Sequence, residues 1–163
     1  MASILNETLA RNAFEKVRPA LELMMRQAMP DRAGCAIVVT TTPAIGPVPG
    51  KEGAPFRERC HLVASIGDLS RSRYPNMEIA LKKAEMSART GLPTGALAAH
   101  HLLAGDTVYT GSAVLEGIVV ACAGLEPRDD EMFSQWIAAA VKAEASRALV
   151  GYLSDKSDTD FYD

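Results

Sequence analysis

The feature that most constrains this chain is a helical segment, residues 76–90, with one face that carries almost no bulk. Ala80, Ala84, Ser87 and Ala88 recur at three- and four-residue steps, which places them together on one side of a helix. Side chains this small allow a helix to lie close against a sheet or a second helix. The sequence therefore predicts a helix that packs unusually near its neighbour.

Apolar segments on both sides of this helix predict strands. Residues 35–42 are β-branched and apolar, and residues 57–68 alternate in polarity. We expect these two to pair antiparallel across the proline- and glycine-rich loop at 43–55. Residues 114–123 give the strongest strand signal, and the Glu-Gly pair at 116–117 divides it into hairpin arms or marks a bulge.

The remaining boundaries follow from caps, prolines and glycines. We expect Ser3 or Asn6 to cap a first helix, with Pro19 producing a kink or two short helices. Asn76 is expected to cap the middle helix. The last helix should begin near Pro127, carry its acidic residues 129–131 at the positive end of the helix dipole, and end at Gly151. Residues 107–110 are short and β-prone, and predict one more strand.

The predicted order is helix, two strands, helix, two or three strands, helix, which indicates an α+β fold with a single antiparallel sheet flanked by helices. A chain of 163 residues is expected to form one domain. We assign residues 1–153 to that domain and residues 154–163 to an acidic, flexible tail.

Composition excludes several classes of protein. The formal net charge of −3 argues against nucleic-acid binding, and no apolar run is long enough to cross a membrane. No signal peptide is recognisable. Cys35, Cys60 and Cys122 are widely spaced in apolar surroundings, which predicts buried free thiols and a cytoplasmic location rather than disulfides or a metal site.

Two segments resemble a known family. Residues 80–88, followed by the Gly-Leu-Pro-Thr turn at 91–94, resemble the A-x-x-K-A-x-T-A helix and Pro-Thr turn of the GlcG/HbpS-like haem-binding (haem-degrading) family. Residues 117–124, followed by Asp130 and Glu131, are similar to that family's strand ending in Ser-Gly and its Q-D-E helix start. The resemblance covers roughly two thirds of the chain.

The resemblance implies a profilin-like α/β sandwich that assembles into dimers or larger rings. Some members of the family bind or degrade haem, others lie beside glycolate or propanediol metabolism, and one branch is fused to cobalamin adenosyltransferase domains. This chain differs from the family in its 40–42 threonines, in the longer loop that follows, and at residues 109–113, where the family has Gly-Gly-x-Pro-Ile. All three differences fall in loops that would line a ligand site.

Candidate ligand-binding residues follow from these motifs. Lys83 matches the family's lysine and could meet a carboxylate or a haem propionate, although its stem could equally cover apolar surface while its ammonium reaches water. His100 or His101 could ligate haem iron, whereas the simpler interpretation is a solvent-facing polar pair. The 107–112 loop adds three further candidates: Thr107, Tyr109 and Ser112.

Three functions remain open from the sequence. The first is a small-ligand-binding protein of the GlcG/HbpS-like family, with haem or another tetrapyrrole as a candidate ligand and a homo-oligomer as its expected state. The second is an enzyme or accessory protein in the catabolism of a small hydroxy- or oxo-acid, with a pocket that combines Lys83 and arginines. The third is an oligomeric structural module without a ligand, assembled through the alanine-rich helix.

Overall fold

The computed structural model describes residues 3–45, 48, 50–156 and 160–162. Four strands form one antiparallel sheet in the order β2-β1-β4-β3. The strands are β1 (Gly34–Thr41), β2 (Leu62–Gly67), β3 (Ser112–Leu115) and β4 (Ile118–Ala123). The α-helices are α1 (Glu7–Ala28), α2 (Phe56–Arg59), α3 (Asn76–Thr90) and α4 (Pro127–Asp155). The 3₁₀ turns are η1 (Leu69–Arg71), η2 (Thr94–Ala96) and η3 (Ala99–His101).

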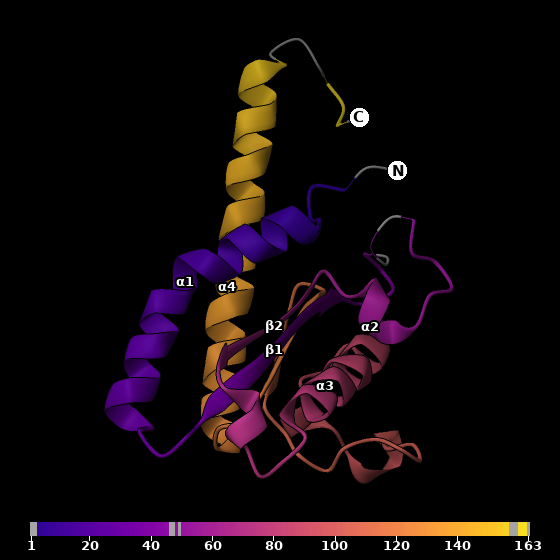
Figure 1. The fold of residues 1–163 in the computed structure, drawn as a ribbon. Helices are drawn as coiled ribbons and strands as arrows, with labels where there is room; N and C mark the ends of the chain where they lie inside the picture. Colours follow the sequence, from indigo (N-terminus) through magenta and orange to yellow (C-terminus); the bar gives the residue numbers. More distant parts are fainter. Residues whose placement is uncertain (1–2, 46–47, 49, 157–159, 163) are drawn as a thin grey trace.

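The helices cover both faces of the sheet (Figure 1). Helices α1 and α4 pack together on one face, and α3 lies on the other. Alternate residues of β1 point to opposite faces of the sheet: Ile37 and Val39 face α1 and α4, whereas Ala36 and Val38 face α3. The predicted α+β fold, a single antiparallel sheet flanked by helices, is therefore confirmed.

Helix α3 lies close to the sheet because small residues meet small residues. Ala80 and Ala84 are fully buried against Ala36, Ala121 and Ala123 of the two central strands. The prediction drawn from the small-residue face is confirmed. The sequence also suggested that the alanine-rich helix could join subunits. This alanine face is instead packed on the sheet of its own chain, so it is not free to join subunits.

Several predicted boundaries are confirmed. Asn6 caps α1 by accepting a hydrogen bond from the Leu9 amide at 2.9 Å. The hairpin between β3 and β4 turns at Glu116 and Gly117, which both have positive φ (49° and 85°). Gly91 ends α3 in the left-handed conformation, with φ 72°. No described helix is both long and apolar enough to span a bilayer.

Other boundaries are corrected. Residues 107–110 form no strand, because β3 begins only at Ser112. The segment 57–68 begins with the helical turn α2, and Cys60 packs on the α3 side rather than with Leu62. Of the two outcomes expected at Pro19, the kink is confirmed and the two short helices are not, because α1 continues through Pro19 as one helix with a visible bend (Figure 1).

The ends of the last two helices also differ from expectation. Asn76 is the first helical residue of α3 rather than its cap, and its side chain donates to the Ser72 hydroxyl at 2.6 Å. Helix α4 continues through Gly151 to Asp155, so it enters the expected tail. Residues 157–159 and 163 of that tail lie outside the described residues.

Candidate functional site

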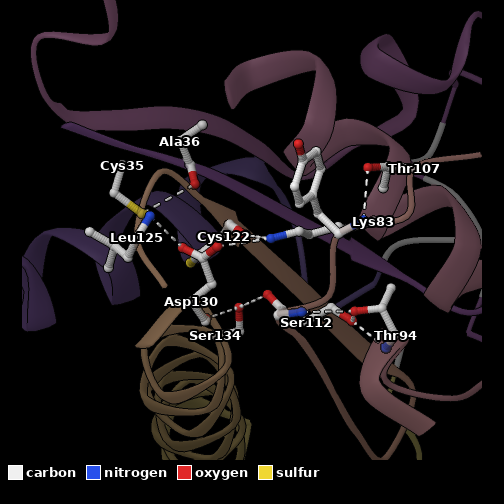
Figure 2. A network of polar contacts seen from close by, with 12 residues as sticks. Cys35, Ala36, Lys83, Thr94, Thr107, Ser112, Cys122, Leu125, Asp130 and Ser134 are labelled. Atoms are coloured by element: carbon white, nitrogen blue, oxygen red, sulfur yellow. Dashed lines mark hydrogen bonds and ion pairs between the residues drawn. The ribbon is translucent and has the colours of Figure 1, made fainter. Parts of the chain in front are cut away.

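Lys83 places a positive charge inside the protein. Its side chain is 1% exposed, and its Nζ donates to the Cys122 carbonyl at 2.7 Å and to Asp130 Oδ2 at 2.9 Å (Figure 2). Its position on the alanine face of α3 explains the burial, since that face lies directly on the sheet. The interpretation in which the Lys83 ammonium reaches water is therefore wrong.

Asp130 comes from the first turn of α4 and completes the pair. It is 3% exposed, and its second oxygen, Oδ1, accepts the Leu125 amide at 3.1 Å. Burial raises the pKa of the Asp130 carboxyl to about 6, although the Lys83 ammonium and the Leu125 amide both oppose that rise. This carboxyl therefore changes its protonation state close to neutral pH.

Hydroxyl groups hold the loop that covers this pair. Ser112 Oγ lies 2.7 Å from Ser87 Oγ and 3.0 Å from Thr94 Oγ1, and it accepts the Thr94 amide at 2.8 Å. Thr94 Oγ1 in turn accepts the Gly111 amide at 3.0 Å. Ser134 Oγ lies within hydrogen-bonding distance of the Gly111 carbonyl, at 3.1 Å. The loop that carries Gly111 is fixed in place from three elements.

Gly111 is the residue where this loop comes closest to the charges. Its φ is 123°, a conformation that side chains disfavour. A Cβ at this position would lie 2.4 Å from the Asp130 Cβ and 3.2 Å from the Lys83 Nζ. The close cover over the ion pair therefore requires glycine.

A cleft of about 330 Å³, which we name the Lys83 cleft, opens beside the pair. It lies between the start of α3, the 109–110 segment and the β4–α4 connection, and both Lys83 and Asp130 line it. Tyr74 and Tyr109 meet edge to face across it, with ring centroids 6.0 Å apart. Arg32 also lines the cleft and pairs with Glu126. Such a mixture of apolar walls and a few charged groups is typical of small-ligand sites.

Two thiols lie in the sheet beneath the pair. Cys35 and Cys122 are fully buried and free, as predicted, and so is Cys60. Contact with the Cys122 thiol and burial hold the pKa of Cys35 well above its ordinary value. Cys35 therefore remains a protonated thiol, which is a poor nucleophile.

The structure brings some of the predicted site residues together. Lys83 and Tyr109 line the same cleft, and the Ser112 hydroxyl supports the loop above it. Thr107 lies outside this cleft, in a separate groove beside α3, and its hydroxyl accepts the Tyr109 amide at 3.2 Å. The sequence offers Arg57, Arg59, Arg71 and Arg73, which flank the second strand, as arginines for such a pocket, but the arginine that lines the cleft is Arg32.

The two histidines lie apart from Lys83. They occupy η3, their ring centroids are 4.4 Å apart, and neither lines the Lys83 cleft. His101 Nδ1 accepts the Ala98 amide at 3.0 Å, so one ring nitrogen is already used. Within the part of the chain that the structure describes, no three His, Cys, Asp or Glu side chains are grouped so that they could hold a metal ion.

Asp130 was not among the predicted site residues, because its place at the start of a helix was explained by the helix dipole. A signal was present, because Asp130, Phe133, Ile137 and Val141 are spaced by three or four residues and so share one helix face. All four are buried. Arg32 and Tyr74, which also line the cleft, belong to loops, where no periodicity marks them.

Comparison with known protein families, with curated proteins and with solved structures finds no match for this chain.

Proposed function

We propose that this protein binds a small organic acid in the Lys83 cleft and that it is a GlcG/HbpS-like protein with a profilin-like fold. The observation that carries this proposal is the Lys83 ammonium. It has three N–H donors, and its two partners among the described residues are the Cys122 carbonyl and Asp130. The third N–H has no acceptor among the described residues, and because Lys83 lines the cleft, a ligand carboxylate bound there would supply one.

The cleft supplies further contacts for such a ligand. The phenol groups of Tyr74 and Tyr109 can donate to a carboxylate or a hydroxyl, and Arg32 adds a second cation at the opening. A volume of about 330 Å³ is at the small end of ligand sites, which favours an acid of a few carbon atoms.

Haem fits this cleft poorly. No histidine, cysteine or methionine lines it, and its volume of about 330 Å³ is at the small end of ligand sites. A small acid requires neither an axial ligand nor a large planar slot. The proposal therefore takes the small acid, and not haem, as the ligand of the Lys83 cleft.

Calorimetric titration with glycolate, lactate, pyruvate and malonate tests the proposal. We expect at least one acid to bind, and to bind more weakly to Arg32→Gln and Tyr109→Phe, which alter the cleft without removing the buried pair. Arg128→Gln is the matched control, since Arg128 is 82% exposed on the first turn of α4. Failure of all four acids to bind would refute the proposal.

A parallel titration with haemin tests the histidines. A Soret shift that His100→Ala and His101→Ala abolish would transfer the ligand site to η3 and would contradict the assignment to the Lys83 cleft. The homo-oligomer stays a prediction, and light scattering of the purified protein measures it.

The second candidate function is an enzyme that acts on a small oxo-acid. The observation that favours it is a carboxyl with a pKa of about 6 next to an ammonium in one cleft. Asp130 would remove a proton from the carbon beside the carbonyl, and Lys83 would stabilise the enolate oxygen. Exchange of pyruvate methyl protons in D₂O, followed by NMR, tests this function. Exchange that persists in Asp130→Asn would contradict it.

A further inference from the structure

A second cleft, of about 660 Å³, lies between the first half of α1, α2 and the start of β2. It has no lining residue in common with the Lys83 cleft. Its ionisable side chains are Glu7, Arg11, Lys51, Arg57, Glu58, Cys60 and His61. We name it the His61 cleft, after its most deeply buried basic residue.

His61 has an unsatisfied polar atom at this cleft. The residue is 4% exposed, and its backbone amide donates to the Val39 carbonyl at 2.8 Å. Its Nδ1 is buried and has no hydrogen-bond partner among the described residues. Buried polar atoms are almost always hydrogen-bonded, so an orphaned nitrogen in a residue that lines a cleft points to a partner that the described residues do not supply.

The charges around His61 favour an anion as that partner. The ammonium of Lys51 is paired with the carboxylate of Glu7. The guanidinium groups of Arg11 and Arg57 form no ion pair or hydrogen bond within the described part of the chain, and both residues are exposed. Glu58 is the one carboxylate of the cleft left to offset these two cations, so the cleft carries a net positive charge.

We propose that the His61 cleft binds a small anion with a phosphate group, held by Arg11 and Arg57 and by the Nδ1 of His61. Guanidinium groups bind phosphate through paired N–H donors, and an imidazole N–H can donate to a third oxygen. Burial lowers the pKa of His61, so the imidazole is neutral at neutral pH and its single ring proton can be placed on Nδ1.

Titration with inorganic phosphate, at constant ionic strength in chloride, tests this site in the intact protein. The chain has three histidines, and NMR of ¹³C,¹⁵N-histidine-labelled protein observes each ring separately. We expect a saturable shift of the His61 signals, while the signals of His100 and His101 stay in place. No saturable change at His61 with millimolar phosphate would overturn the proposal.

Variants identify the groups that hold the anion. Arg11→Gln and Arg57→Gln are each expected to weaken phosphate binding about tenfold, the effect of losing one charge-assisted contact. Arg71→Gln is the matched control, since Arg71 is an exposed arginine outside the cleft, and Arg32→Gln separates this site from the Lys83 cleft.

Two other results would also be decisive. Equal phosphate binding by the double variant Arg11→Gln/Arg57→Gln, shown to be folded by circular dichroism, would overturn the site. Saturable shifts of His61 with malonate but not with phosphate would overturn the phosphate assignment.

Discussion

Replacing Lys83 with methionine tests whether the Lys83 ammonium compensates the buried charge of Asp130. Methionine has nearly the same length and volume, so the variant removes the charge and leaves little cavity. Breaking a buried pair by removing one partner destabilises a protein by about 3–5 kcal/mol, because the other charge stays buried without compensation. We expect a loss of that size in the free energy of unfolding near pH 8.

The loss must depend on pH, because Asp130 can take up a proton. In the wild-type protein its pKa is about 6, and removing the Lys83 ammonium raises that pKa further. Above about pH 6 the variant therefore keeps a proton on Asp130 that the wild type has released. The destabilisation then grows with pH by up to about 1.4 kcal/mol per pH unit, until Asp130 also ionises in the variant.

Urea denaturation near pH 5.5 and near pH 8 measures both quantities. The single tryptophan, Trp136, is a suitable fluorescent reporter because it stacks on the buried Phe133 of α4. Lys82→Met is the matched control, since Lys82 is the neighbouring lysine of α3 but forms an exposed pair with Glu85. A loss from Lys83→Met that equals the control, or that is the same at both pH values, would refute this reasoning.

Three further predictions concern the same region. Gly111→Ala is expected to destabilise the protein by about 2–4 kcal/mol more than Gly105→Ala in thermal unfolding, because both have positive φ but only Gly111 lacks space for a Cβ. Ser112→Ala removes the acceptor of the buried Thr94 amide and should lower the free energy of unfolding in urea by about 1–3 kcal/mol. The control Ser146→Ala, at an exposed serine, should leave that free energy almost unchanged. The pKa of Asp130 is about 4 in the unfolded chain and about 6 in the folded protein, so its protonated form stabilises the fold fully below about pH 4, and this stabilisation is lost as the pH rises through about 6. The difference is about 3 kcal/mol, and the unfolding free energy of Asp130→Asn should lack this dependence on pH.

Most of the fold could be predicted from sequence because its signals are local. The small-residue face of α3, the Glu-Gly hairpin turn and the Asn6 cap each depend on neighbouring residues alone. The predicted strand at 107–110 failed because β propensity needs a partner strand. The Gly111 carbonyl still accepts the Cys122 amide of β4, but residues 107–110, which precede this glycine with its φ of 123°, have no partner strand.

The candidate site was harder to predict because its parts are distant in the sequence. Lys83 and Asp130 are 47 residues apart, and the sequence alone does not show that α4 brings a carboxylate to α3. A lysine on an alanine face fits both a buried pair and an ammonium that reaches water. His61 was predicted to lie on a strand that begins earlier, whereas the residues before it form the helical turn α2, whose Arg57 lines the same cleft as His61.

The central claim is that the Lys83 cleft, and not the histidine pair, receives a small acid. The most direct measurement is a titration of ¹⁵N-labelled protein with the tightest-binding acid, followed through the backbone amide signals. We predict concerted, saturable shifts at Thr110, Leu125 and Asp130, which line the cleft together with Lys83. Saturable shifts confined to His100 and His101, or no shift at any of these residues, would contradict the account.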